Sequence, residues 1–383
     1  MKIGLVTSYM PPHLGGIEQI AESLFRGYAA QGVEVRWVSS RIPAALPPRE
    51  GNRIRVPCFN LLEDLLGVPV PVWGRRGWRE VEAVAAWADA LHVLECLYLT
   101  SAMAVSAARR LGTPVVVTQN VGFIAYRFPP LNWVERAAWA TLGRSVIGRA
   151  SHVVLATPTA EAYVRELLGG VPAHASAFPI GIDTARFSPA SAIERTAARA
   201  RLGLEPGPPV VLFAGRLVEK KGVPLVLEVA RALPEVRVLV AGDGPLRTAL
   251  HAAPASVTWL QAIAADRMLD CYHAADAVLL PSSGEGLPLV VQEAMACGLP
   301  VVISSDEIYA EALAAAEACL ASPRAAAPLA GAVRAALGPD GAAVGGRARA
   351  YAGAHWSATT MVARYVELME RLLARPAPLG RPA

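Results

Sequence analysis

Short apolar runs alternate with amphipathic helical segments along almost the whole chain, and this alternation restricts the fold more than any other feature. A strand, a helix and a second strand form the unit of a parallel sheet, because the helix returns the chain to the starting edge. We therefore predict a doubly wound α/β protein. In the first half, the predicted strands are Lys2–Ser8, Glu34–Ser39, Ala90–Cys96, Pro114–Gln119 and His152–Ala156. The predicted helices there are Ile17–Gln31, Leu99–Leu111, Leu131–Ile147 and Thr159–Leu168.

The strand pattern starts again after a proline-rich segment that ends at Pro209. The predicted strands of the second half are Val210–Ala214, Val236–Ala241, Val257–Gln261, Ala277–Pro281 and Pro300–Ser304. A chain of 383 residues also exceeds the roughly 150 residues of a typical domain. Two domains with a boundary in the range 185–208 follow, and a last helix is predicted at His355–Leu373.

The composition agrees with a globular chain and argues against several classes of protein. Hydrophobic residues make up 54% and charged residues 18%, which favours packed cores over disorder. The mean hydropathy is +0.36, yet no uncharged run of about 18 apolar residues suggests a membrane span. A net charge of +4 without a basic cluster gives little reason to expect nucleic acid as a partner. Five scattered cysteines and no visible signal peptide favour a cytoplasmic location.

Gly15 and Gly16 precede the helix predicted to follow the first strand. A helix amino terminus offers unpaired N–H groups to an anion, and glycine lets a ligand approach the backbone closely. An ordinary turn is the alternative, because the full dinucleotide-binding fingerprint G-x-G-x-x-G is missing.

A second motif, Gly215-Arg216-x(4)-Lys221-Gly222, follows the first strand of the second half. At the carboxyl end of a strand, Arg216 and Lys221 can converge on a diphosphate, the first as a planar fork and the second as a point charge. A solvated charged loop explains the same pattern.

The block from Pro281 to Pro300 is the most specific of the motifs and carries two glutamates. Glu285 is predicted in the loop after a strand, and Glu293 about two turns into the next helix. Gly286 and Leu287 lie where the helix begins, so their N–H groups can face a phosphate. A carboxylate further along the helix can accept hydrogen bonds from two sugar hydroxyls.

These motifs occur in one order, and together they resemble the retaining family-four glycosyltransferases of GT-B architecture. The resemblance runs from Met1 to about Leu373 and includes Ala241–Pro245. It implies two Rossmann-like domains that face each other across a cleft, with the last helix crossing back to the first domain. The implied parts are an acceptor-binding domain at 1–185, a nucleotide-sugar-binding domain at 186–355, and a helix and tail at 356–383.

The resemblance also implies the reaction and the roles of the motifs. A sugar would move from a nucleoside-diphosphate sugar to a glycan, a lipid-linked glycan or a small molecule, with retention at the anomeric carbon. Glu293 would hold the ribose of the donor, and Glu285 the transferred sugar. Arg216 and Lys221 would neutralise the leaving diphosphate with help from the 15–16 backbone. The donor is then a substrate, no cofactor is implied, and the cationic side chains replace a metal ion.

Two positions depart from the family pattern. Asn120 stands where relatives usually carry a histidine near the donor sugar, and asparagine cannot change its charge near neutral pH. Activity should be weak if a base is needed there, whereas a purely orienting role suits an asparagine or a different sugar. Ser304–Ile308 replaces a Gly-Gly loop in the expected wall of the donor pocket.

Three further features have two interpretations each. His92 is interpreted as structural, although relatives carry a histidine at that strand end, and His13 either faces water or touches substrate. Val70–Arg79 mixes tryptophan with arginine, which suits a membrane interface or a glycan-stacking surface. A loop with core-anchoring tryptophans fits that segment equally well. Peripheral contact with the inner face of a membrane is therefore a further expected partner.

Two other functions fit parts of the sequence. A sugar-nucleotide epimerase could have two Rossmann domains, but the paired glutamates argue against it. A non-catalytic nucleotide-sugar binder or partner subunit would explain Asn120 and the departure at Ser304–Glu307. The presence of Glu285, Glu293 and the two cations opposes that alternative, because a decayed site would lose its charged groups.

Overall fold

The computed structural model describes residues 1–13, 15–60, 70–123, 129–204 and 206–374, which divide into two compact units. Unit 1 comprises Met1–Gly181 and the segment from Ala358 onward, and unit 2 comprises Ile182–Ser357. The Ile182 N–H donates to the Trp356 carbonyl at 2.8 Å, and Ile182 forms a parallel bridge with Ser357. The two ends of unit 2 therefore lie side by side.

Unit 1 is built on an eight-stranded sheet of order β10-β9-β8-β7-β1-β2-β4-β3, in which only the pairing of β3 with β4 is antiparallel. Its strands are β1 (Lys2–Val6), β2 (Glu34–Ser40), β3 (Arg49–Glu50), β4 (Arg53–Val56), β7 (Ala90–Leu94), β8 (Val115–Gln119), β9 (His152–Leu155) and β10 (Ala175–Ala177). A separate antiparallel pair consists of β5 (Cys58–Phe59) and β6 (Val72–Trp73). Because the order reverses between β1 and β7, the topological switch point of this sheet lies there.

Helix α7 (Pro158–Leu168) of unit 1 begins and ends at residues suited to those positions. In α7, Thr157 accepts a hydrogen bond from the Ala160 N–H and Pro158 opens the first turn, while Gly169 ends the helix in the left-handed conformation. The described helices are α1 (Gly16–Ala30), α3 (Arg75–Trp87), α4 (Leu99–Leu111), α5 (Pro129–Ala138), the π-helical η1 (Trp139–Gly143), α6 (Arg144–Arg149), α7 (Pro158–Leu168) and α15 (Ala358–Leu373).

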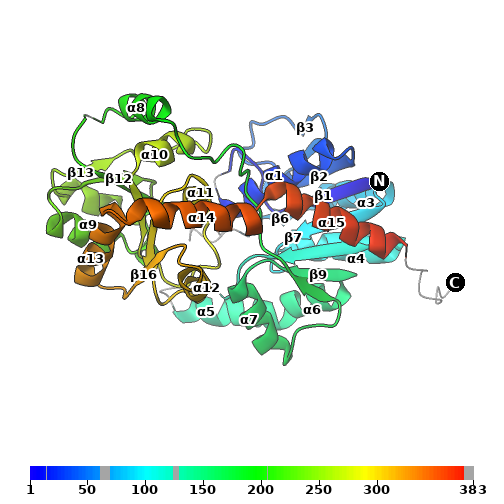
Figure 1. Cartoon of the computed structure of the whole chain (residues 1–383). Helices are drawn as coiled ribbons and strands as arrows, with labels where there is room; N and C mark the ends of the chain where they lie inside the picture. Colours follow the sequence, from blue (N-terminus) through cyan, green and yellow to red (C-terminus); the bar gives the residue numbers. More distant parts are fainter. Residues whose placement is uncertain (14, 61–69, 124–128, 205, 375–383) are drawn as a thin grey trace. The chain divides into compact units, whose positions relative to one another are not determined.

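The last helix, α15, returns to unit 1 after the chain has completed unit 2, as the family resemblance implies. It packs on α1 (Figure 1) where Gly27 leaves room, since a Cβ there would lie 2.4 Å from Cγ2 of Val362. The Tyr365 hydroxyl lies 2.8 Å from Oγ1 of Thr118, and its ring centroid lies 4.4 Å from that of His92. The core of unit 1 thus includes residues more than 240 positions apart.

Unit 2 is built on a six-stranded, fully parallel sheet of order β13-β12-β11-β14-β15-β16. Its strands are β11 (Val210–Ala214), β12 (Arg237–Ala241), β13 (Val257–Trp259), β14 (Ala277–Leu280), β15 (Val301–Ser304) and β16 (Leu320–Ser322). Its helices are α8 (Ala192–Arg201), the 3₁₀ turn η2 (Glu219–Lys221), α9 (Val223–Ala232), the 3₁₀ segment η3 (Pro245–Ala252), α10 (Met268–Ala274), α11 (Leu289–Ala296), α12 (Ile308–Ala315), α13 (Ala326–Leu337) and α14 (Gly341–His355). The switch point lies between β11 and β14.

The prediction of two Rossmann-like sheets is confirmed, and the differences concern short strands and one helix. The sequence did not reveal the short strands β3 to β6, β10 and β16, or the helix α3, which begins inside the tryptophan and arginine segment. Trp73 is buried and donates from Nε1 to Oγ of Ser40 at 2.8 Å. Arg110 lies over the half-buried Trp78 ring, 4.6 Å from its centroid. Trp73 is therefore a core anchor, but a strand and a helix start replace the expected loop.

Candidate active site

The motifs of the second half meet at the switch point of unit 2. Gly215–Gly222 follows β11, and Pro281–Pro288 follows β14, the strand hydrogen-bonded beside it. The Ser283 N–H donates to the Lys220 carbonyl at 2.8 Å, which ties the two loops together. In open α/β sheets ligands bind at this position, outside the carboxyl ends of the strands.

Gly222 allows this close approach of the two loops. Its φ of 75° lies in the left-handed region, and a Cβ on it would lie 2.3 Å from the carbonyl oxygen of Pro281. A side chain would therefore meet both a backbone penalty and a steric clash. The last glycine of the Arg216 motif is thus required by the packing of one loop against the other.

Two lysines hold the carboxylate of Glu285 at this junction. Nζ of Lys221 lies 3.0 Å from Oε2 of Glu285, and Nζ of Lys220 lies 3.3 Å from Oε1. Burial alone would raise the pKa of Glu285, but the two lysine charges outweigh it and hold the pKa below its usual value. Glu285 is consequently ionised at neutral pH and can accept hydrogen bonds from hydroxyl groups.

Arg216 belongs to the same loop but differs from the lysines in its surroundings. Its side chain is exposed, and its guanidinium makes no hydrogen bond or ion pair with the described residues. The structure does not bring it into contact with Glu285. It remains available for a planar, two-point contact with an external phosphate.

Glu293 lies in the second turn of α11 and is 7% exposed. The Tyr272 hydroxyl, from α10, donates to its Oε2 at 2.6 Å. Burial raises the pKa of Glu293 to about 7, although the Tyr272 hydrogen bond and the charge of Arg186 act in the opposite direction. The two glutamates of one motif thus have pKa values shifted in opposite directions, below the usual value for Glu285 and above it for Glu293.

Gly286 and Leu287 connect Glu285 to Pro288, which precedes the first residue of α11. Both are half-buried, and they come just before the helix amino terminus rather than inside it. The backbone of this connection lies between the ionised Glu285 and the positive end of the α11 dipole. That position suits contact with an anion.

Glu307 is a neighbour of the site whose role the sequence did not reveal, although the departure at Ser304–Ile308 marked its position. It is 3% exposed and precedes α12, but its side chain does not cap that helix. Instead Oε2 accepts the Glu285 N–H at 3.0 Å. Burial, and to a lesser degree the Glu285 charge, raise the pKa of Glu307. The segment that replaces the expected Gly-Gly loop therefore supports the Glu285 loop directly.

Gly15 and Gly16 lie in unit 1, at the amino terminus of α1 and after β1. A Cβ on Gly15 would lie 2.2 Å from Oε2 of Glu18, so that carboxylate lies close to the helix start. His13 lies 2.8 Å from Oε1 of Glu18 through Nδ1 and stacks on Tyr9 with ring centroids 4.1 Å apart. His13 therefore contacts Glu18 and Tyr9 rather than facing only water.

Asn120 lies directly after β8 and is 4% exposed. Its backbone N–H and its Nδ2 both donate to Oε1 of Glu95, at 3.0 and 2.6 Å. The Thr157 hydroxyl donates to its backbone carbonyl at 2.8 Å. The buried Glu95 follows β7 and was not among the predicted site residues, because a glutamate at a strand end carries no recognisable spacing signal.

His92 is completely buried in β7, which supports its structural interpretation. Its Nδ1 lies 2.8 Å from the Tyr28 hydroxyl, and its Nε2 lies 2.8 Å from Oγ1 of Thr118. Burial lowers its pKa to about 3. The ring is therefore neutral at physiological pH and joins α1, β7 and β8.

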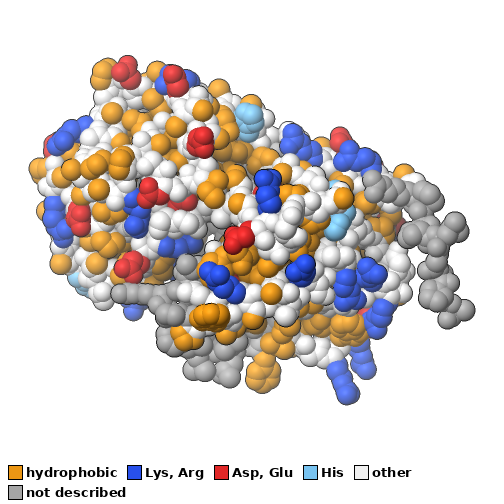
Figure 2. All heavy atoms as spheres, turned by 90° about the horizontal axis from the view of Figure 1, so that it is seen from below, with side chains coloured by type: hydrophobic (Ala, Val, Ile, Leu, Met, Phe, Trp, Pro, Cys, Tyr) orange, Lys and Arg blue, Asp and Glu red, His pale blue; other side chains and the backbone are white. Residues whose placement is uncertain are grey.

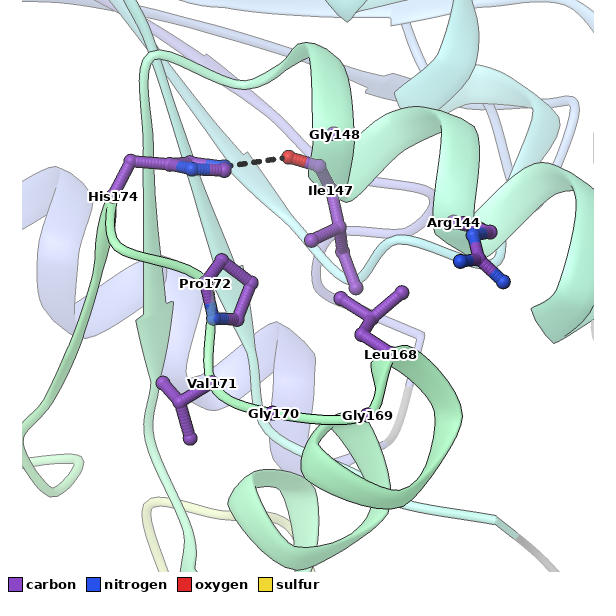
Figure 3. A pocket seen from close by; sticks show the side chains of 9 residues that line it. All are labelled: Arg144, Ile147, Gly148, Leu168, Gly169, Gly170, Val171, Pro172 and His174. Atoms are coloured by element: carbon purple, nitrogen blue, oxygen red, sulfur yellow. Dashed lines mark hydrogen bonds between the residues drawn. The ribbon is translucent and has the colours of Figure 1, made fainter.

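A hollow of about 360 Å³ in unit 1 lies away from all these residues (Figure 3). Its walls come from the 144–148 and 168–174 segments, and Nε2 of His174 lies 3.0 Å from the Ile147 carbonyl. His174 precedes β10, so the hollow is at the amino edge of the sheet, whereas Asn120 and Gly15 follow the carboxyl ends of strands. Ligand sites of α/β sheets lie at the carboxyl edge, and we assign no role to this hollow.

The described ranges contain neither a cluster of metal ligands nor a membrane-spanning helix. No group of three or more histidine, cysteine, aspartate or glutamate side chains there could hold a metal ion. No helix among those residues is long and apolar enough to cross a membrane. On the face in Figure 2, basic and acidic side chains both lie among hydrophobic and uncharged ones, which is an ordinary surface pattern.

Comparison with known proteins gives one consistent result for both units. Residues 15–181 match the family described as "Glycosyl transferase 4-like domain", and residues 194–340 match "Glycosyl transferases group 1". A D-inositol 3-phosphate glycosyltransferase of Xylanimonas cellulosilytica is 30% identical over 331 residues, which cover 76% of this chain and 75% of that protein. The protein of the same name from Mycobacterium sp. (strain KMS) is 35% identical over 175 residues, 42% of this chain and 39% of that protein.

Solved structures agree in fold at lower identity. The sucrose-phosphate synthase of Thermosynechococcus elongatus has a TM-score of 0.77 and 20% identity, over 97% of this chain and 99% of that one. HepE of Anabaena, solved in complex with UDP, has a TM-score of 0.76 and 18% identity, over 97% and 100% of the two chains. The fold is therefore GT-B. The chain belongs to the group 1, or type-4-like, glycosyltransferases.

Proposed function

We propose that this protein transfers a sugar from a UDP-sugar to a hydroxyl-bearing acceptor, with retention at the anomeric carbon and without a metal ion. The Lys220, Lys221 and Glu285 cluster at the switch point of unit 2 carries the proposal, because it combines cationic charge with an ionised hydroxyl acceptor. HepE was solved with UDP-glucose, which supports a UDP-sugar as the first donor to test.

In the proposed reaction, Arg216 and Lys221 stabilise the charge that develops on the leaving diphosphate. Stabilisation of that charge lowers the barrier only if the cations interact more strongly with the transition state than with the ground state. The exposed guanidinium of Arg216 is free to move onto the phosphates. Lys221 already lies beside Glu285, so one cation can contact both the phosphate and the group that binds the transferred sugar.

Glu293 and Tyr272 are proposed to hold the ribose of the nucleotide. A carboxylate with two oxygens accepts from two neighbouring hydroxyls, and the Tyr272 hydrogen bond fixes the orientation of the group. Backbone N–H groups of Gly286 and Leu287 are proposed to contact the diphosphate just before α11.

Unit 1 is proposed to recognise the acceptor. By the family resemblance, the Gly15 and Gly16 backbone contacts the donor phosphates, and Asn120 contacts the transferred sugar. The acceptor is a glycan, a lipid-linked glycan or a small molecule. The relatives named D-inositol 3-phosphate glycosyltransferases make a small phosphorylated polyol the first acceptor to try.

Peripheral membrane contact is part of this proposal. The antiparallel pair of β5 and β6 exposes Phe59 and Val72 by 80% and 43%. The exposed Arg75 and Arg76 follow directly at the start of α3. Apolar side chains beside arginines suit the headgroup region of an anionic membrane. A lipid-linked acceptor would be found at that surface, and the reaction would take place on its cytoplasmic side.

A non-catalytic nucleotide-sugar binder of the same fold is the second candidate. The asparagine at 120 favours it, because that position resembles the one where relatives usually carry a histidine. Such a protein would bind a nucleotide sugar without turning it over.

Substitution of the lysines separates the two candidates. We expect Lys221→Ala to lower turnover about a hundredfold, as expected for the loss of one preorganised stabilising group, and Glu285→Ala to lower it by a similar factor. Lys220→Ala is the matched control, because the Lys220 side chain is 40% exposed against 14% for Lys221. This variant should lower turnover much less. Initial rates with UDP-sugars and acceptors measure these effects. Equal rates for Lys221→Ala, Glu285→Ala and the unmodified protein would contradict the site assignment, and UDP binding without any product would favour the binder.

A further inference from the structure

The carboxylate of Glu95 is buried at the carboxyl end of β7 and has no role in the function proposed above. Glu95 is 4% exposed and has a φ of 66°, in the left-handed region that a glutamate adopts at a cost. Backbone strain of this kind persists where the surrounding contacts over-determine it, and it is enriched at functional sites. The contacts of the Glu95 side chain indicate which arrangement this strained backbone conformation serves.

Hydrogen bonds from Gln119 and Asn120 converge on this carboxylate. Nε2 of Gln119 donates to Oε2 at 2.5 Å, while the backbone N–H and Nδ2 of Asn120 donate to Oε1 at 3.0 and 2.6 Å. Gln119 is itself fixed, since its Oε1 accepts the Cys96 N–H at 2.8 Å. The backbone and the side chain of Asn120 are therefore both held by one oxygen atom of Glu95.

The chemistry of the partner decides which way the Asn120 amide faces. An ionised carboxylate accepts hydrogen bonds and cannot donate them, so the NH₂ group must point at Glu95 and the amide oxygen away from it. That oxygen, Oδ1, is buried and has no hydrogen-bond partner among the described residues. A buried acceptor without a partner costs free energy in the unliganded protein, and a ligand hydroxyl would recover it.

We propose that Glu95 is a positioning residue that holds the Asn120 amide with its unpartnered oxygen turned away from Glu95, so that Asn120 accepts a hydrogen bond from a hydroxyl of the transferred sugar. This inference rests on the proposed function, in which Asn120 contacts that sugar. It assigns to Asn120 the role of acceptor rather than donor. The protein would thus favour donors with a hydroxyl at the matching ring position over those with an ether or a deoxy carbon.

The ionisation of Glu95 gives this arrangement a pH dependence. Burial raises the pKa of Glu95 to about 7, against the lowering effect of the hydrogen bonds from Asn120 and Gln119. A protonated carboxyl can donate to an amide oxygen, so the amide can then turn over. The neighbours from β8 and α7, Gln119, Asn120 and Thr157, are uncharged. The adjacent titratable group, the Cys96 thiol, has its pKa raised well above its usual value by burial and by the Glu95 charge.

The test is a double-mutant cycle measured across pH 5.5 to 8.5. Rates with a saturating UDP-sugar are compared for the unmodified protein, Glu95→Gln, Asn120→Ala and the double variant. Glu166→Gln is the matched control, because it removes an exposed carboxylate from α7 of the same unit. We expect Glu95→Gln to lower kcat by up to about a hundredfold, as a misplaced contact does, and to abolish the inflection near pH 7. In the Asn120→Ala background, Glu95→Gln should not lower kcat any further.

Two results would overturn the inference. One is a double variant whose loss is the product of the two single losses, since Glu95 would then act independently of Asn120. The other is a pH profile of kcat that is the same in Glu95→Gln as in the unmodified protein. If the unmodified protein turns over no donor, the proposed function fails instead.

Unfolding in urea tests the titration of Glu95 without any donor, because its readout does not depend on turnover. A raised pKa in the folded state means that stability falls as pH rises from about 4.5 to 7. This contribution must be present in the unmodified protein and absent in Glu95→Gln. Equal pH dependence in both proteins would contradict the titration assigned to Glu95.

Discussion

At the scale of single residues, the two glutamates of one motif are set to different protonation behaviour by their neighbours. Lysines hold the pKa of Glu285 low, whereas burial raises that of Glu293 to about 7. The spacing of the motif predicted that both would lie near the switch point of unit 2. It could not predict their ionisation, because Tyr272 and Lys220 reach them from other elements.

The raised pKa of Glu293 predicts a pH-dependent affinity for the nucleotide. An ionised Glu293 accepts from two ribose hydroxyls, while a protonated one has lost part of that capacity. We expect the Kd for UDP to rise as pH falls from 8 to 6, and Glu293→Gln to bind more weakly but with little change over this range. Calorimetric titration measures both. A Kd for the unmodified protein that is constant across this range would argue against Glu293 as the ribose ligand.

His92 predicts an acid sensitivity of unit 1. Its folded pKa of about 3 lies below the unfolded value of 6.5, so its contribution to stability is complete above pH 6.5 and is lost as pH falls toward 3. The loss from this residue is roughly 1.4 kcal/mol per pH unit. Urea unfolding of His92→Gln, which keeps a polar side chain without the charge, should give a flatter acid limb. Parallel curves of stability against pH for the two proteins would exclude His92 as the origin of the acid sensitivity.

The parts of the site that the sequence could not predict are mostly single residues that belong to no motif or periodic pattern. Glu95 and Glu307 each support a predicted site residue, one by holding Asn120 and the other by accepting the Glu285 N–H. Their partners are 25 and 22 positions away. No local pattern links residues across that distance, because the contact exists only after the strands have paired.

At the scale of elements, strands and helices with a clear period were predictable, and short ones were not. β11 and α4 match their predicted bounds, since buried parallel strands and amphipathic helices leave continuous patterns. β16 has three residues and β6 has two, too few for a period of two to be visible. The helix predicted from 131 to 147 is interrupted by the π-helical η1, which no composition signal announced.

The contact between α1 and α15 predicts a difference between two helical glycines of unit 1. A Cβ at Gly27 would lie 2.4 Å from Val362, whereas a Cβ at Gly148 in α6 would meet nothing within 4 Å. Gly27→Ala should therefore destabilise the protein by roughly 1–3 kcal/mol through overpacking. Gly148→Ala should stabilise it by about 0.5–1 kcal/mol by reducing chain entropy. Denaturant midpoints measure both, and shifts of the same sign would show that α15 does not constrain α1.

At the scale of the whole molecule, the division into two units predicts where a nucleotide acts. The groups proposed to bind UDP belong to unit 2, so hydrogen exchange should slow in the 215–222 and 281–288 loops and in α11 when UDP is added. At 100 times its Kd, the ligand stabilises the state that binds it by about 2.7 kcal/mol. A panel of nucleoside diphosphates in the same assay identifies the base. Protection confined to unit 1 would contradict the proposed donor site.

The return of α15 to unit 1 also determines the order in which the protein can be made. All of unit 2 leaves the ribosome before the helix that brings Tyr365 to the buried His92 and Thr118. A nascent chain can therefore complete its second unit while the first still exposes apolar surface, which is the kind of intermediate that chaperones bind. An mRNA truncated before the codons of α15 would not encode a partly active protein. Its product would keep unit 1 open and become a substrate for proteolysis.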